Sequence, residues 1–171
     1  GLGDVYKRQA LFLPYLKEMN LKNLCIASPD MGGTKRANTY AKFLQTDVVV
    51  CYKHRDKANE VSKMMILGDV KDKNVVLVDD MVDTAGTLTK AADLMMEQGA
   101  ISVRACCTHA ILSGNAYDKI NNSKITELLV TDSLPLKNNS KKIKAIPIAK
   151  LFSDTIKCVQ ANKSISTNFI C

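Results

Sequence analysis

The chain has 171 residues, of which 46% are hydrophobic and 24% are charged, a composition typical of a globular domain. This length allows one domain with a substantial core, but not two large ones. No apolar run reaches the roughly 20 residues that a membrane-spanning helix requires. The net charge of +7 could indicate a nucleic-acid partner, but the lysines are scattered and lack interleaved aromatic residues. We therefore predict no nucleic-acid and no membrane partner, and we consider a site for a polyanionic small molecule.

The cysteines and the first residues bear on compartment and boundaries. Six cysteines and two histidines contain no Cys-x-x-Cys pair and no spacing typical of a zinc site. Several cysteines fall inside apolar runs, where thiols behave as small hydrophobic groups, and this predicts a reducing, cytoplasmic compartment. Residues 1–9 lack the apolar stretch of a secretory signal and continue no recognisable element. We expect residues 1–9 to be a non-native or disordered leader and residues 10–171 to form the domain.

Short apolar runs alternate with amphipathic stretches along the rest of the chain. The predicted strands are residues 24–27, 47–52, 75–78, 102–107, 127–131 and 143–146. The predicted helices are residues 11–19, 34–44, 87–98, 115–121 and 149–160. The run Val75-Val76-Leu77-Val78 is continuously apolar, which is typical of a strand covered on both faces, and Gly99 suits a left-handed helix cap. The pattern predicts an α/β fold with a parallel-sheet core flanked by helices, in one Rossmann-like layered domain.

One polar stretch interrupts this alternation. Residues 53–63 follow a predicted buried strand and carry many charges without an apolar period. We expect them to form a long polar loop, and such loops on compact domains are often functional lids.

The turn after the strand at residues 75–78 carries the strongest chemical signal. Asp79 and Asp80 stand where this strand is expected to end, and ligands of open α/β sheets bind at the carboxyl ends of strands. The next residues lead into a predicted helix, whose free N–H groups and positive dipole favour phosphate. Gly86 would let the backbone approach an anion closely, and the hydroxyls of Thr84 and Thr87 could donate further hydrogen bonds. Paired carboxylates beside a phosphate nest predict a sugar-phosphate ligand.

Two other interpretations explain this turn less well. Asp83 or Thr84 alone would more often cap the helix, but the whole string from Asp79 to Thr87 favours a ligand. A Walker P-loop does not fit, because no Gly-x-x-x-x-Gly-Lys string followed by Ser or Thr occurs. Lys35 and Arg36 fall in the first turn of a predicted helix, which is unfavourable for its dipole. Such cations are consistent with a nearby anionic ligand or with simple solvation.

The string Asp79-Asp80-Met81-Val82-Asp83-Thr84-Ala85-Gly86-Thr87 resembles the phosphoribosyl-pyrophosphate binding loop of the type I phosphoribosyltransferase fold. Other segments are similar to ribose-phosphate pyrophosphokinases: Ser28-Pro29-Asp30-Met31-Gly32-Gly33 followed by Lys35-Arg36-Ala37, Tyr52-Lys53-His54-Arg55, Cys106 to Gly114, and Thr131-Asp132-Ser133. The resemblance extends from about Leu11 to the carboxy terminus. The binding loop alone would indicate only the wider fold, whereas the segments in this order are specific.

The resemblance implies transfer of diphosphate from ATP to the anomeric hydroxyl of ribose 5-phosphate, giving phosphoribosyl pyrophosphate and AMP, with Mg²⁺. It implies catalytic roles for Lys53 and Arg55, which as loop cations could stabilise phosphate charge in the transition state. It implies that Asp30 helps to hold the metal, although a bare Asp would more often be a helix cap. It implies ribose 5-phosphate binding by Asp79, Asp80, Asp83, Thr84, Ala85, Gly86 and Thr87. His109 is expected to satisfy a hydrogen bond at a strand end rather than to act in catalysis.

The family's chain is about twice as long, and its amino-terminal half supplies most ATP-binding residues and much of an oligomer interface. We therefore expect an acceptor site here, with the ATP pocket largely in the absent half, little activity alone, and a homo-oligomer at full length. Two alternatives remain open. A base-specific phosphoribosyltransferase would share the binding loop but would not require the Lys53-x-Arg55 pattern. A non-catalytic regulatory subunit of the synthetase would be favoured by loss of that pair, and both residues are present.

Overall fold

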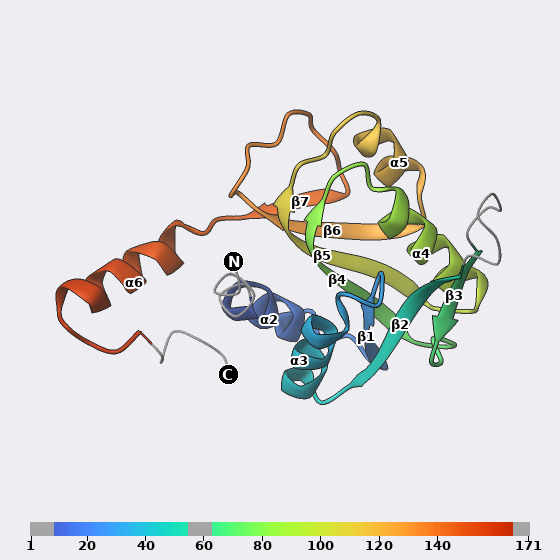
Figure 1. Cartoon of the computed structure of the whole chain (residues 1–171), viewed down its shortest axis with the longest axis horizontal. Coiled ribbons are helices and arrows are strands. Elements are labelled where there is room, and N and C mark those ends of the chain that lie inside the picture. The colour runs from blue at the N-terminus through green and yellow to red at the C-terminus, as the bar shows by residue number, and fades with distance from the viewer. Residues whose placement is uncertain (1–8, 55–62, 166–171) are drawn as a thin grey trace.

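The computed structural model describes residues 9–54 and 63–165 of the chain, which build one sheet and its covering helices. The seven strands lie in the order β3-β2-β1-β4-β5-β6-β7, so β3 and β7 form the two edges (Figure 1). Every neighbouring pair is parallel except β2 and β3, which are antiparallel. The strands are β1 (Leu24–Ser28), β2 (Asp47–His54), β3 (Lys63–Leu67), β4 (Asn74–Val82), β5 (Ser102–Ala110), β6 (Ile125–Thr131) and β7 (Ile143–Ile146).

Helices cover both faces of this sheet. The described helices are α2 (Gln9–Glu18), α3 (Thr34–Leu44), α4 (Gly86–Glu97), α5 (Ala116–Asn122) and α6 (Ala149–Gln160). The helices α2 and α3 share one core cluster with Val76 and Val78 of β4. The helices α4 and α5 share the other cluster with Val75 and Leu77. Alternate residues of β4 are thus buried on opposite faces, which explains its continuous apolar run.

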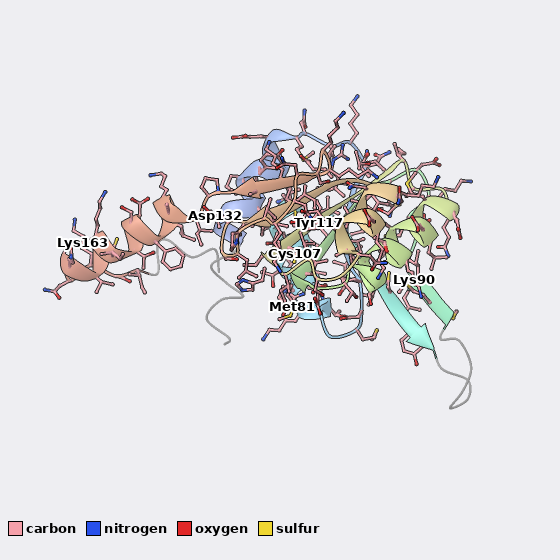
Figure 2. The ribbon with its side chains drawn as sticks, turned by 90° about the horizontal axis from the view of Figure 1, so that it is seen from above. Met81, Lys90, Cys107, Tyr117, Asp132 and Lys163 are labelled. Atoms are coloured by element: carbon pink, nitrogen blue, oxygen red, sulfur yellow. The ribbon has the colours of Figure 1, made fainter. Side chains whose placement is uncertain are left out.

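The helix α6 differs from the other helices because none of its residues is buried. It extends away from the body of the domain (Figure 1), and Figure 2 shows Lys163, just beyond it, far from Cys107 and Tyr117. Its apolar stripe of Phe152, Ile156 and Val159 is exposed, at 54% or more for each side chain. Among the described residues, no helix has the length and apolar character to cross a membrane.

The α/β fold class and the parallel core are confirmed, as is the left-handed Gly99 with φ of 91° after α4. The interpretation of residues 53–63 as one long loop is wrong at both ends. Lys53 and His54 belong to β2, and Lys63 begins β3, which was not predicted. The hairpin was hidden because β3 is an edge strand with exposed Met65, and only Met64 and Ile66 pack against the core. The expected leader at residues 1–9 lies outside the described residues, apart from Gln9 at the start of α2.

The strand order locates the place for a ligand. From β1 the chain passes through α3 to β2 on one side, whereas β4 lies on the other side of β1. The loops that leave the carboxyl ends of β1 and β4 therefore diverge and leave a crevice between them. Such a switch point is the general ligand site of open α/β sheets. It is formed here by the loop that contains Asp30 and by the segment from Asp79 to Thr87.

Candidate functional site at the switch point between β1 and β4

The loop after β1 is held by its own side chains. Ser28 Oγ donates a hydrogen bond of 2.6 Å to the carbonyl oxygen of Asp30, and Asp30 Oδ1 accepts one of 2.9 Å from the Gly33 N–H. A Cβ atom at Gly33 would overlap Ser28 Oγ and would lie 3.3 Å from Arg36 Nη1. Glycine is therefore required at position 33. The loop presents an exposed Asp30 carboxylate toward the crevice and allows the Arg36 side chain to pass.

Asp79 and Asp80 lie within β4 rather than after it, because the strand continues to Val82. Both acids bind one guanidinium group. Arg36 Nη1 lies 2.9 Å from Asp79 Oδ1, and Nη2 lies 3.2 Å from Asp80 Oδ2. The Asp80 N–H also donates to Asp79 Oδ1 at 2.8 Å. The first-turn cation Arg36 is thus compensated by carboxylates of the protein itself.

The two carboxyl groups ionise differently. Burial raises the pKa of Asp79 to about 6, and its hydrogen bond with Asp80 acts in the same direction. Burial also opposes ionisation of Asp80, but its hydrogen bond with Asp79 and the Arg36 charge lower the pKa of Asp80 below its ordinary value. At mildly acidic pH, Asp80 is therefore ionised to a greater extent than Asp79, because Asp80 is the stronger acid.

The segment from Asp83 to Thr87 is positioned by residues that follow β5. Ser113 Oγ donates a hydrogen bond to Asp83 Oδ1, and the Ser113 N–H donates to the Asp83 carbonyl at 3.1 Å. Lys119 Nζ of α5 donates to the Thr84 carbonyl at 3.1 Å. The helix α4 begins at Gly86 without a side-chain cap and without an acidic residue in its first turn. Neither Asp83 nor Thr84 is therefore a helix cap, and the first N–H groups of α4 face no competing carboxylate of that turn.

The unusual backbone in this segment belongs to Ala85, not to Gly86. Ala85 has a left-handed φ of 59°, a conformation that costs free energy for any residue with a Cβ atom. Gly86 does not have a positive φ, and a Cβ atom there would meet only Thr84 Oγ1 at 3.9 Å and Lys119 Nζ at 4.0 Å. The fold accommodates a larger residue at position 86, so the open space beside its backbone is available to a ligand.

These residues enclose a cavity of about 200 Å³. It joins Asp30 from the β1 loop to Asp79 of β4 and to the start of α4, whereas the predicted site residue Asp80 is not part of its lining. Its lining is Asp30, Asp79, Met81, Val82, Asp83, Thr84, Ala85, Gly86, Thr87 and Leu88. Two larger surface hollows, of about 420 and 350 Å³, lie around Gln45, and Asp47 is the only carboxylate among their lining residues. The smaller cavity combines carboxylates with a helix start, and we therefore take it as the candidate site.

The structure describes the predicted metal ligand Asp30 but not the side chains of the predicted catalytic pair, Lys53 and Arg55. Lys53 lies in β2 opposite Met64, but its side chain and the whole of Arg55 are outside the described residues, so their roles stay predictions. No cluster of three or more metal-ligating side chains occurs in the described part of the chain. Asp30 nevertheless suits Mg²⁺, because Oδ2 is left for a ligand, and this ion is commonly held by one or two carboxylates, waters and substrate phosphates.

Sequence reasoning missed three functional contacts. The contact of Arg36 with the two acids joins positions 43 residues apart, and its only signal was a cation in an unfavourable helix turn. Ser113 and Lys119 reach Asp83 and Thr84 across 30 and 35 residues. Ser113 lies within the family-like segment from Cys106 to Gly114, but no local pattern indicates the partner of either residue. By contrast, the expected strand-end hydrogen bond of His109 is present, since its Nδ1 lies 3.0 Å from Ser133 Oγ beyond the end of β6.

Comparison with known proteins identifies the family. The model of the phosphoribosyl synthetase-associated domain matches residues 55–170. The chain belongs to this family. A ribose-phosphate pyrophosphokinase from Porphyromonas gingivalis is 51% identical over 92% of this chain and 50% of its own length. One from Campylobacter jejuni is 49% identical over 94% of this chain and 52% of its own length. This phosphoribosyl synthetase-associated chain thus spans about half the length of the curated relatives that it matches.

Solved structures agree with the fold. A phosphoribosylpyrophosphate synthetase from Mycobacterium smegmatis has a TM-score of 0.82 and 31% identity, over 91% of this chain and 51% of its own. A purine phosphoribosyltransferase from Pyrococcus horikoshii has a TM-score of 0.50 and 26% identity, over 63% of this chain and 76% of its own. The domain therefore has the type I phosphoribosyltransferase-like α/β fold that the binding-loop resemblance implied.

Proposed function

We propose that this chain is the ribose 5-phosphate-binding half of a ribose-phosphate pyrophosphokinase, the enzyme that transfers diphosphate from ATP to ribose 5-phosphate. One observation carries the proposal: a single cavity joins the carboxylates of Asp30, Asp79 and Asp83 to the uncapped start of α4, and Asp80 binds the same guanidinium group as Asp79. The two ends of this cavity suit the two ends of one sugar phosphate. The names of the relatives, which are about twice as long, support the same activity.

The ligand would lie with its phosphate at Asp83 to Thr87 and its hydroxyls at Asp79 and Asp80. The start of α4 has no side-chain cap and no acidic residue in its first turn, and the helix dipole favours a dianion there. Carboxylate oxygens accept hydrogen bonds from sugar hydroxyls, which a phosphate nest cannot provide. Such two-ended binding fixes the orientation of the sugar, and orientation lowers the barrier of a group transfer.

The chemical step would depend on charge stabilisation. We propose that Lys53 and Arg55 bind the transferred diphosphate as cations, and that Asp30 contributes one ligand to Mg²⁺. The ion would neutralise phosphate charge and orient the diphosphate when bound. The remaining ATP pocket and the contacts of a homo-oligomer are proposed for the part of the enzyme absent from this chain. The free thiols Cys25, Cys51 and Cys106 support a reducing, cytoplasmic location.

A base-specific phosphoribosyltransferase remains the second candidate. The Pyrococcus horikoshii structure favours it, because that purine phosphoribosyltransferase shares the fold at 26% identity. The Lys53-x-Arg55 pattern and the higher identity to pyrophosphokinases favour the first candidate. A purine base that binds this chain together with phosphoribosyl pyrophosphate would reverse that order.

Isothermal titration of the 171-residue chain with ribose 5-phosphate tests the proposal. We expect saturable binding that is abolished or strongly weakened in Asp80→Asn, because the variant replaces a hydroxyl-accepting carboxylate. Asp72→Asn serves as the matched control, since Asp72 is an exposed acid at a positive φ of 57° that Asn also tolerates. Absence of detectable ribose 5-phosphate binding to the unmodified chain would contradict the assignment of this sugar phosphate to the cavity.

A further inference from the structure

Among the described residues, Arg36 forms ion pairs with both Asp79 and Asp80 at the candidate site. Its side chain is only 13% exposed, although it belongs to the first turn of α3 near the surface of the crevice. There is no acidic residue in that turn, so the helix itself offers the guanidinium no partner. The position is electrostatically unfavourable for a cation unless β4 supplies the compensating charge.

Strand geometry makes this contact informative. Consecutive residues of a strand point toward opposite faces, so Asp79 and Asp80 would normally separate. The two η nitrogens of Arg36 nevertheless bind one oxygen of each carboxylate, at 2.9 and 3.2 Å. A planar guanidinium can hold two acceptors in a fixed relation, whereas a lysine ammonium is only a point charge. Asp79 and Asp80 thus lie close together where Arg36 bridges their carboxylates.

The carboxylates of Asp79 and Asp80 can accept further hydrogen bonds beyond those that they already make. Asp79 Oδ1 accepts from Arg36 and from the Asp80 N–H, and Asp80 Oδ1 accepts from the Met81 N–H at 3.0 Å. Each carboxylate oxygen has more than one acceptor position, and Asp79 also lines the cavity. The space that Arg36 occupies depends on Gly33, where a Cβ atom would lie 3.3 Å from Nη1.

We infer that Arg36 is a positioning residue that holds Asp79 and Asp80 together as one acceptor for the hydroxyls of a sugar phosphate. This inference rests on the proposed function, because it assigns that sugar to the cavity. Arg36 acts through the carboxylates and not on the phosphate, whose proposed place is the start of α4. Its loss therefore affects recognition of the sugar and leaves recognition of phosphate unchanged.

Two titrations of the chain separate these effects. Ribose 5-phosphate is titrated by calorimetry, and inorganic phosphate is titrated while the amide signal of Gly86 is followed by NMR. In Arg36→Gln and Arg36→Lys we expect ribose 5-phosphate to bind about tenfold more weakly, with phosphate affinity unchanged. Lys35→Gln is the matched control, because it removes the same charge from the same helix turn at an exposed position. Its affinity for both probes should equal that of the parent chain.

Each outcome decides between distinct conclusions. If Arg36→Gln does not fold because it leaves two partly buried carboxylates unpaired, Arg36→Lys keeps the charge and decides the question. Unchanged ribose 5-phosphate affinity in the folded Arg36 variants would overturn the inference alone. Equal losses for both probes, or a similar loss in Lys35→Gln, would show a general electrostatic or structural effect and would also overturn it. A parent chain that binds phosphate but not ribose 5-phosphate would overturn the proposed function, and the inference with it.

Discussion

Adjacent acids acquire different properties from their surroundings at the scale of single residues. Asp79 and Asp80 have the same side chain, yet Asp79 is 23% exposed and Asp80 is 40% exposed. Burial and a shared hydrogen bond raise one pKa, while the same hydrogen bond and Arg36 lower the other. This separation has a measurable effect on the pH dependence of stability.

The first prediction concerns Asp79→Asn and the free energy of unfolding. Because the folded pKa of Asp79 is about 6 and its ordinary value is 3.8, this carboxyl contributes stability below about pH 4, which is lost as the pH rises through 6. Asp80 has the opposite sign, and its contribution is lost only below its ordinary pKa. Urea unfolding of both chains at pH 4 to 6 should show the parent losing stability relative to Asp79→Asn as pH rises. A difference that grows in the opposite direction would contradict the pKa shift.

The second prediction concerns Gly86→Ala. Position 86 has room for a methyl group and no positive φ, so the substitution should leave stability unchanged or raise it by up to about 1 kcal/mol. If an anion approaches the backbone there, the same methyl group should weaken phosphate binding. Thermal unfolding and a phosphate titration measure the two effects. Gly68→Ala is the contrasting control, because its φ is 115° and a Cβ atom would lie 2.6 Å from Val49 Cγ1, so it should destabilise the fold.

At the scale of helices and strands, burial distinguishes α2 from α6. Phe12, Leu13 and Leu16 of α2 are almost fully buried, whereas α6 buries no residue. Both segments have an amphipathic pattern that predicts a helix. The pattern does not reveal which of the two helices packs its apolar face against the sheet. Burial of an apolar helix face depends on the tertiary arrangement, which the periodicity of the sequence does not encode.

The third prediction follows from this contrast. Leu13→Ala should reduce the free energy of unfolding by about 2–5 kcal/mol, because it creates a cavity against the sheet. Ile156→Ala on α6 should change it by about 0.5 kcal/mol or less, since that side chain is 54% exposed. Denaturant unfolding of the two variants provides the measurement. A large loss for Ile156→Ala would mean that α6 contributes to the folding unit after all.

The sequence predicted most elements but not all of their ends. The helices at residues 34–44 and 149–160 agree with the structure because their apolar periods are clear. The end of β4 was misplaced because aspartates are poor strand formers, and here they continue the strand through Val82. The Arg36 contact was beyond local patterns because only the assembled sheet brings α3 to the end of β4. The left-handed backbone of Ala85 was not predicted, because residues with a Cβ atom rarely adopt it.

At the scale of the whole molecule, the chain spans about half the length of the curated relatives that it matches. The family match and the cavity support an acceptor site, whereas the relatives of known activity are about twice as long. A diphosphate transfer needs a bound donor as well as a bound acceptor. We therefore expect this polypeptide to bind the acceptor, ribose 5-phosphate, without providing a complete site for the donor, ATP.

The fourth prediction is that the chain alone binds ribose 5-phosphate but does not release AMP from ATP at a rate comparable with the full-length enzymes. A coupled AMP assay, with a full-length ribose-phosphate pyrophosphokinase as the positive control, measures this rate. Supplying the remaining half as a second polypeptide should restore turnover, and in that complex Lys53→Ala should lower it by more than about tenfold. Robust turnover by the chain alone would show that the missing half is not needed.

The two edges of the sheet differ in their resistance to aggregation. The short edge strand β7 contains Lys144 and directly follows Lys141 and Lys142, and charged edges oppose unwanted pairing with another chain. The opposite edge, β3, exposes Met65 and Leu67 and carries no charge between Met64 and Leu67. Self-association of the isolated chain into β-aggregates is therefore expected to start at β3. A lysine at Met65 would be the simplest way to improve its behaviour at high concentration.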